Sequence, residues 1–280
     1  ITFRLLDFAD LTVDGSIATG AAVSVMLIRA GVSPIATLPI AFLAGALAGM
    51  VTGLLNTALG IPGILASILT QISLYSINLN IMGKANQPVS VDNYPLVVSL
   101  RYVTDGSVSR LLFFLGMIVF LLALIAVMYW YFGTEQGHAI RATGCNGNMA
   151  RAQGINTNFI KVLALMISNG LVGLCGALYG QFQGASDVNM GRGAIVIGLA
   201  AVIIGEVLFG KFASKRKLAF AFTLASVILG AVIYYMVYQF VLWLKMPSED
   251  MKLFSAIVVA IFLAIPYLKE KRTLRKGASK

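Results

Sequence analysis

Histidine, cysteine and charged side chains are scarce in this sequence. Its 280 residues include one histidine and two cysteines, and only 11% are charged. One histidine cannot supply the two histidines of an HExxH zinc site. The sequence also shows no convincing Ser–Lys or Asp–Asp pair of the kind that an intramembrane enzyme would need. Cys145 falls in an expected loop and Cys175 in the middle of an expected helix, so we predict no disulfide. We therefore expect no catalytic residues, no metal site and no cofactor in this chain.

Hydrophobic residues, in contrast, make up 59% of the chain, and the mean hydropathy is +0.88. Several apolar runs reach the roughly 17–25 residues with which a helix crosses about 30 Å of hydrocarbon. The sequence lacks the alternating ten-residue segments of an outer-membrane barrel. It therefore predicts an all-α, polytopic membrane protein. Eight spans are expected, at residues 15–30, 36–59, 63–82, 111–132, 159–182, 194–209, 217–243 and 253–268.

The ends of the chain bear on its topology. The opening ITFRLL has no initiator Met and reaches an arginine within four residues, so we expect a truncated ninth helix before it. The tail at 269–280 and the loop KFASKRK at 211–217 are strongly basic. By the positive-inside rule both are expected in the cytoplasm, and counting spans places residues 133–158 there too. The net charge of +10 then reflects topology and lipid headgroups, and we expect no nucleic-acid binding.

One segment resembles the P-loop of nucleotide-binding proteins but lacks one of its required residues. GEVLFGKF at 205–212 fits GxxxxGK, but Phe212 stands where a P-loop has the Ser or Thr that holds magnesium. We therefore expect that this chain does not bind ATP by itself.

Glycines recur every four residues in two apolar runs, which places each set on one helix face. Small residues of this kind allow close helix contacts in membranes. We predict a packing role, with faces that slide during transport as the alternative. The two sets are Gly45, Gly49 and Gly53, and Gly176, Gly180 and Gly184.

A weak internal repeat relates the two halves of the chain. DGSIATGAAVSV at 14–25 aligns with RGAIVIGLAAVI at 192–203, with matching Gly, Ile, Gly and Ala. In the expected topology the two copies enter the membrane from opposite sides, as the inverted repeats of transporters do.

Polar residues in or beside the spans are candidates for a pathway or gate. Each has a structural alternative: the aspartates would cap the helix that starts near Gly15, Glu206 would pair with Lys211 or Lys215, and the amides would bond a neighbouring helix. The candidates are Asp10, Asp14, Asn56, Gln71, Asn78, Asn169 and Glu206.

The polar stretch GHAIRATGCNGNMARAQGI at 137–155 interrupts the apolar runs. It is too short for a domain and too rich in Gly and Ala for a core, so we expect one or two short helices on the cytoplasmic face. Small residues would let a partner approach closely, with Arg141 and Arg151 making charge-assisted contacts at the rim. An inert loop is the alternative.

This stretch resembles the cytoplasmic coupling loop of ABC importer permeases of the ribose and branched-chain amino-acid type, G-R-A-I-R-A-x-G-x-N-x-x-A-A-x-x-G-I. His138 replaces the usual Arg, and Arg151 stands at a usual Ala. ADLTVDGS near the start resembles the family's D-L-S-V-G-S, and GLAAVIIGEVLFG at 198–210 resembles its A-A-x-x-x-G-G segment with Glu206 in place of the second Gly. The matching loop residues are Gly137, Ala139, Ile140, Arg141, Ala142, Gly144, Asn146, Ala150, Gly154 and Ile155.

The resemblance implies a single permease domain over residues 1–280, with the coupling loop at 133–158, in the bacterial cytoplasmic (inner) membrane. It implies a homodimer or heterodimer of permeases, separate ATPase subunits that hold ATP and magnesium, and an extracellular solute-binding lipoprotein. The N-terminal and Glu206 motifs favour a subgroup linked to amino-acid uptake, aromatic amino acids included. Sugars and nucleosides are the competing substrates, and a secondary transporter or channel that needs no ATPase is the alternative mechanism.

Overall fold

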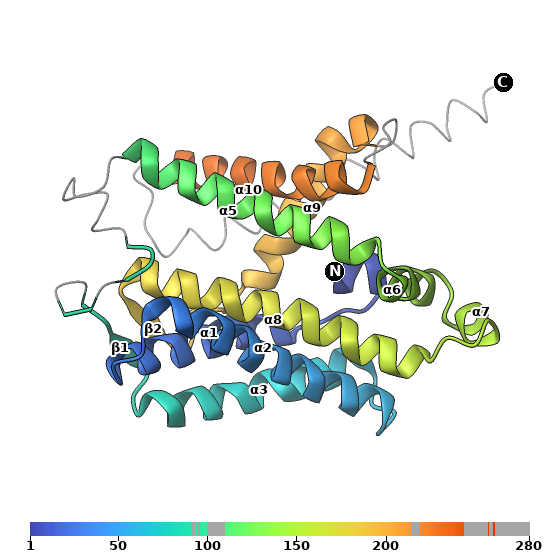
Figure 1. The fold of residues 1–280 in the computed structure, drawn as a ribbon, viewed down its shortest axis with the longest axis horizontal. Helices are drawn as coiled ribbons and strands as arrows, with labels where there is room; N and C mark the ends of the chain where they lie inside the picture. Colours follow the sequence, from blue (N-terminus) through green and yellow to red (C-terminus); the bar gives the residue numbers. More distant parts are fainter. Residues whose placement is uncertain are drawn as a thin grey trace. The chain divides into compact units, whose positions relative to one another are not determined.

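The computed structural model describes residues 1–90, 93–94, 96–99, 110–213, 219–243, 257 and 260 (Figure 1). Helices dominate these residues, with two short strands between them. In chain order the elements are the π-helical turn η1 (Thr2–Leu6), α1 (Thr12–Arg29), α2 (Pro34–Thr57), α3 (Gly63–Met82), β1 (Asn86–Pro88), α5 (Arg110–Phe132), α6 (Glu135–Cys145), α7 (Gly147–Ala152), α8 (Thr157–Gln183), β2 (Ala185–Asp187), α9 (Ala194–Ala213) and α10 (Ala219–Trp243).

The helices confirm the predicted all-α, polytopic class. Seven of the eight expected spans coincide with helices to within a few residues, and the eighth, at 253–268, lies outside the described residues except for 257 and 260. Five described helices are long and apolar enough to cross a membrane, and Ala194–Leu208 is a shorter apolar helix. The five are Pro34–Thr57, Gly63–Met82, Leu111–Phe132, Thr157–Gln183 and Phe220–Gln239.

The helix ends follow local sequence signals. Pro34 opens α2 at a position where its missing N–H costs nothing. Gly83 ends α3 in the left-handed conformation, at φ 71°. The side chain of Asn156 caps α8 by accepting from the Phe159 N–H.

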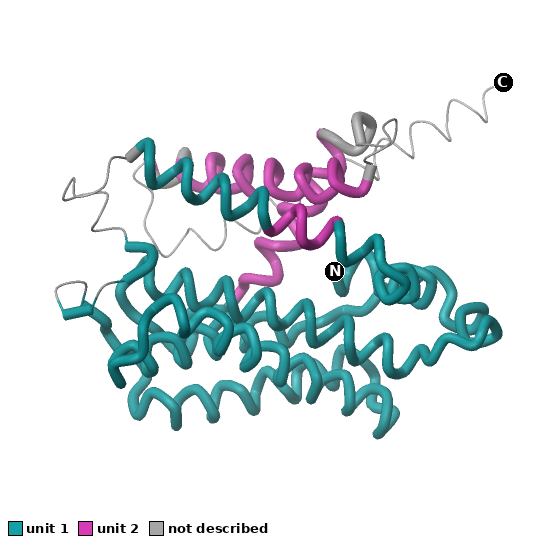
Figure 2. Tube along the Cα trace, viewed as in Figure 1, with its two compact units in different colours: residues 1–123, 130–192 teal, residues 124–129, 193–280 magenta. Residues whose placement is uncertain are grey.

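The chain forms two compact units, residues 1–123 with 130–192 and residues 124–129 with 193–280 (Figure 2). In the second unit α9 packs along α10 around Ala200, Ile204 and Tyr234. The two helices meet closely, because a Cβ added at Gly205 would lie 2.2 Å from the carbonyl oxygen of Ser226. The expected single domain over 1–280 includes residues outside those described and stays a prediction.

In the first unit α1 and α2 pack along α8, and α3 packs mainly on α1. The α2 glycine ladder lies against α8: a Cβ at Gly45 would sit 2.2 Å from the Asn169 carbonyl oxygen, and one at Gly49 2.2 Å from that of Leu165. A Cβ at Gly53 would lie 2.9 Å from the Cα atom of Val162. These contacts leave no room for a side chain at the interface of α2 and α8.

The second ladder divides into two roles. Gly176 and Gly180 face α1, with a Cβ at Gly176 falling 2.1 Å from the carbonyl oxygen of Ile17. Gly184 differs from the prediction, because it lies beyond the last residue of α8 and ends that helix at φ 70°. Gly184 therefore caps the end of α8 in the left-handed conformation, next to β2, and does not pack against another of the described helices.

The two strands join segments far apart in the sequence. β1 and β2 pair antiparallel, with Gln87 opposite Ser186. The Arg29 guanidinium donates to the Gln87 side chain, so the ends of α1 and α8 and the start of β1 lie together. The predicted coupling loop lies beyond the other end of α8, because α7 precedes Thr157 by only a few residues.

Candidate functional site

The expected coupling loop forms two short helices, α6 and α7, joined at Asn146. Thr134 caps α6 by accepting from the Gly137 N–H at 3.4 Å. Asn146 ends α6 with an extended backbone and caps α7, its side-chain oxygen accepting from Asn148 and Met149 at 3.1 and 3.0 Å. Each cap satisfies N–H groups that a helix start leaves unpaired, so these short helices are specified locally.

The inner face of α6 packs against its own unit. Ile140 is fully buried, and a Cβ at Gly137 would lie 2.4 Å from the Phe132 Cα. A Cβ at Gly144 would lie 1.9 Å from the carbonyl oxygen of Leu5 in η1. Gly137 and Gly144 therefore hold α6 against the end of α5 and the start of the chain.

The two arginines that were predicted at the rim both bond within the chain, and Arg151 is exposed. Arg141 is partly buried and donates to the backbone oxygen of Phe132. Arg151 donates to the Thr157 hydroxyl at 3.0 and 3.2 Å. Both guanidinium groups thus fasten the short helices to the ends of α5 and α8.

The outer face of α6 and α7 is open. Met149 is 64% exposed, and His138, Ala142 and Cys145 are exposed as well. A shallow groove of 670 Å³ runs beside α6. Four of the predicted coupling residues line this groove: His138, Ala139, Ala142 and Ile155.

The remaining predicted coupling residues shape the exit from α7. Ala150 is buried, and its carbonyl oxygen accepts from Ile155 at 3.1 Å. Gly154 turns the chain at φ 83°, a conformation that favours glycine.

Asp10 and Asn169 lie in a buried polar network where α1 begins. The Asn169 side chain donates to the Asp10 carboxyl group at 2.7 Å and accepts from the Ser16 hydroxyl at 2.7 Å. Both Asp10 and Asn169 are buried, so this network fixes the start of α1 beside the middle of α8. The Asp10 side chain also accepts from the Thr12 N–H at 3.0 Å.

A row of threonines continues the polar contacts from α1 through α2 to α3. The hydroxyls of Thr12 and Thr52 lie 2.8 Å apart, and Thr52 donates to Thr70 at 2.9 Å. All three side chains are buried. Hydrogen bonds of this kind stabilise helix association where water is absent.

Asp14, Gln71 and Asn78 line one pocket, between α1, α3 and the segment that follows β2. Asn56 lies elsewhere: its amide donates to the Ile61 backbone oxygen at 2.8 Å and closes the turn after α2. Glu206 lies on α9 in the second unit. The structure thus brings together two sets of the predicted pathway residues, Asp10 with Asn169 and Asp14 with Gln71 and Asn78.

The family described as the permease component of the branched-chain amino acid transport system matches residues 1–266. The chain belongs to this permease family. It is a multi-pass membrane protein, as its helices indicate. No solved structure matches it.

Three relatives illustrate the range of the family. The permease is 39% identical to the tyrosine transport system permease protein of Clostridioides difficile, over 94% of this chain and 84% of the relative. It is 31% identical to an uncharacterised protein of Rickettsia prowazekii, over 94% and 90% of the two chains. The autoinducer 2 import system permease protein LsrC of Yersinia pseudotuberculosis is 28% identical over 84% of the permease and 62% of LsrC.

Several residues that the sequence did not single out lie beside the predicted pathway residues in the structure. Thr52 and Thr70 had no signal, because a lone threonine in an apolar run is ordinary. Tyr75, Asn189 and Arg192 line the same pocket as Asp14. Arg192 did have a signal, since it is a charged residue directly before an apolar helix.

Proposed function

We propose that this permease is the membrane-spanning subunit of an ATP-binding-cassette importer for amino acids, with tyrosine and other aromatic amino acids favoured. An extracellular solute-binding lipoprotein would deliver the substrate, and a second permease copy would complete the path. Separate ATPase subunits would bind ATP and magnesium and supply the energy. The chain itself acts as a transport subunit and carries out no catalysis.

The observation that carries this proposal is the form of the coupling segment. Two capped helices are fastened to the end of α5 and the start of α8, and their outer face is exposed. We infer that this face lies in the cytoplasm, with the basic tail, and that the ATPase receives it. Force applied to α6 would pass to α5 through Arg141 and to η1 through Gly144.

The tyrosine transport relative supports an amino-acid substrate, because its similarity extends over nearly the whole chain. A sugar or related small molecule is the second candidate, and similarity to the autoinducer 2 permease favours it. An ATPase-independent transporter or channel would have no use for a docking face of this form.

Acidic substitutions on the outer face test the coupling role. We expect Ala142→Glu and Met149→Glu to reduce ATPase stimulation by the loaded binding protein more than about tenfold, because each would bury an unpaired charge at the docked interface. Thermal unfolding of the purified permease should be unchanged, since both side chains are exposed. The measurement is ATP hydrolysis in reconstituted vesicles.

Lys84→Glu serves as the control for these variants. It also introduces an acidic group at an exposed position, but beside β1 at the other end of α8, and it should retain normal stimulation. Normal stimulation in Ala142→Glu and Met149→Glu would refute the docking role of this face.

A further inference from the structure

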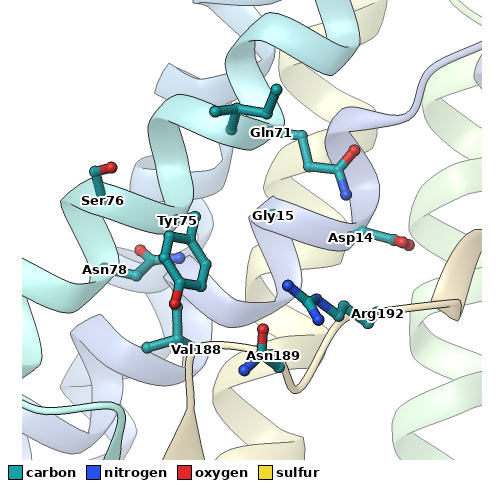
Figure 3. A pocket seen from close by; sticks show the side chains of 10 residues that line it. Asp14, Gly15, Gln71, Tyr75, Ser76, Asn78, Val188, Asn189 and Arg192 are labelled. Atoms are coloured by element: carbon teal, nitrogen blue, oxygen red, sulfur yellow. The ribbon is translucent and has the colours of Figure 1, made fainter.

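A pocket of 290 Å³ lies between α1, α3 and the residues after β2 (Figure 3). It is close in size to the smaller ligand sites of proteins, which begin at about 300 Å³. Residues from all three segments contribute to its wall. The lining consists of Asp14, Gly15, Gln71, Ile72, Tyr75, Ser76, Asn78, Val188, Asn189 and Arg192.

The pocket lies at the depth of the middle of α8. Ser16 bonds to Asn169 at 2.7 Å, and Asn169 is the thirteenth residue of this 27-residue helix. Asp14 precedes Ser16 by half a turn. Gly191 packs directly on Asp14, since a Cβ there would lie 1.9 Å from the Asp14 carbonyl oxygen. The segment after β2 therefore returns to the level where α1 begins.

Arg192 is consequently a charged residue at membrane depth. Its side chain is exposed on this chain, and Ile72 and Tyr75 beside it on α3 are 63% and 44% exposed. A guanidinium group facing lipid at this depth is costly, so such groups face a water-filled cavity or another protein surface. The Arg192 guanidinium group therefore requires water or a protein surface beside it at this depth.

Asn78 gives independent evidence for a ligand. It is fully buried in the pocket wall, yet neither its side-chain oxygen nor its nitrogen has a hydrogen-bond partner. Leaving both groups unsatisfied costs free energy. Because both amide atoms are buried, the side chain has to rotate toward the pocket for a ligand to bond to them and recover that cost. The neighbouring Gln71, Tyr75 and Asn189 add further groups that can bond to a polar ligand.

The charges in the pocket indicate the kind of ligand. Asp14 and Arg192 are the two charged residues among its ten lining residues. In Figure 3 the Arg192 guanidinium group points toward Tyr75 and Asn189, whereas the Asp14 carboxylate points away from it. A guanidinium group binds a planar carboxylate through two parallel hydrogen bonds. The first turn of α1, at Asp14 and Gly15, adds the partial positive charge of a helix N-terminus.

We propose that this pocket binds the carboxylate of the transported amino acid on its way through the permease, with Arg192 as the anchor and Asn78 as a hydrogen-bonding partner. This inference rests on the proposed function and names the group of the substrate that is recognised. A neutral sugar would leave the guanidinium group without a counter-charge, so the pocket favours amino acids over sugars. Arg192 and Asp14 are also the first residues of the two aligned repeat segments, and both line this pocket.

Arg192→Gln and Arg192→Lys test the anchor in vesicles that contain the permease, its ATPase and its binding protein. We expect Arg192→Gln to lower ATP-driven tyrosine uptake roughly ten- to a hundredfold, because it removes a charge-assisted hydrogen-bonded pair. Arg192→Lys should recover part of this loss. ATP hydrolysis stimulated by the loaded binding protein should persist in both, so that fewer tyrosines enter for each ATP consumed. Lys84→Gln, which removes an exposed positive charge outside the pocket, should transport normally.

Asn78→Leu separates ligand binding from a structural role. The substitution removes two unsatisfied buried groups, so thermal stability should stay the same or rise, while tyrosine uptake falls severalfold. Asn80→Leu, an exposed position on the same helix, is the control and should not change uptake. If Arg192→Gln fails to assemble, Asn78→Leu decides the question by itself.

The outcomes distinguish the two proposals. Wild-type uptake of ribose or a nucleoside with no amino-acid uptake would overturn both the amino-acid function and the carboxylate pocket. If the wild-type permease takes up tyrosine or leucine and Arg192→Gln leaves this uptake unchanged, the carboxylate pocket is overturned and the importer function still stands. Where Arg192→Gln does not assemble, unchanged uptake by Asn78→Leu has the same meaning.

Discussion

The Gly49→Leu permease should fail to form a stable, monodisperse protein. A Cβ at this position would lie 2.2 Å from the carbonyl oxygen of Leu165 and 2.7 Å from its carbonyl carbon. These are backbone atoms of α8, so the clash can be relieved only by moving α2 away from α8. That movement would also separate Gly45 and Gly53 from α8, and we expect a loss of about 3 kcal/mol or more. Size-exclusion chromatography and thermal unfolding in detergent would measure it.

Gly116→Leu provides the matched control. It makes the same change within a membrane-spanning helix, but a Cβ at Gly116 would meet nothing within 4 Å, so stability should change little. An unaltered melting temperature for Gly49→Leu would mean that α2 and α8 do not meet along this ladder.

The Asn169→Leu permease should lose about 3 kcal/mol of stability. Asn169 bonds at once to Asp10, Ser16 and the backbone oxygen of Leu165. Removing its amide would leave the buried Asp10 carboxyl group and the Ser16 hydroxyl short of partners, and such groups are costly away from water. Thermal unfolding is the measurement, with Asn158→Leu at an exposed position in the first turn of α8 as the control.

A double-mutant cycle sharpens this prediction. Replacing both partners with apolar groups removes the unsatisfied carboxyl group, so Asp10→Leu combined with Asn169→Leu should be less destabilised than the sum of the two single variants. Strict additivity would show that the bond between Asp10 and Asn169 does not hold the start of α1 in place.

The membrane-spanning helices could be predicted from the sequence because the bilayer sets one length and one polarity for them. The predicted span at 63–82 coincides with α3, and that at 159–182 lies within α8. The predicted span begins at Gly15, whereas α1 begins at Thr12, because polar residues such as Thr12 precede the apolar run. Hydropathy assigns these residues to a loop, whereas in the structure Thr12 bonds to Thr52 inside the helix packing.

The candidate sites were predictable in part. The spacing of Gly45, Gly49 and Gly53 indicated a helix face, and the motif around Arg141 indicated the short helices α6 and α7. The direction of individual side chains was not predictable, so Arg141 was expected at the rim although it bonds to the end of α5. The pocket with Asn78 and Arg192 requires the segment after β2 to fold back onto Asp14, a contact between residues far apart in sequence.

Uptake of labelled tyrosine tests the central claim most directly. Vesicles would contain the permease with its ATPase, and the binding protein would be added outside with tyrosine, leucine, ribose or a nucleoside, with or without ATP on the ATPase side. We predict uptake of the amino acids only when ATP and the binding protein are both present. Uptake by vesicles that contain the permease alone would contradict the account, because the protein would then be a secondary transporter or channel.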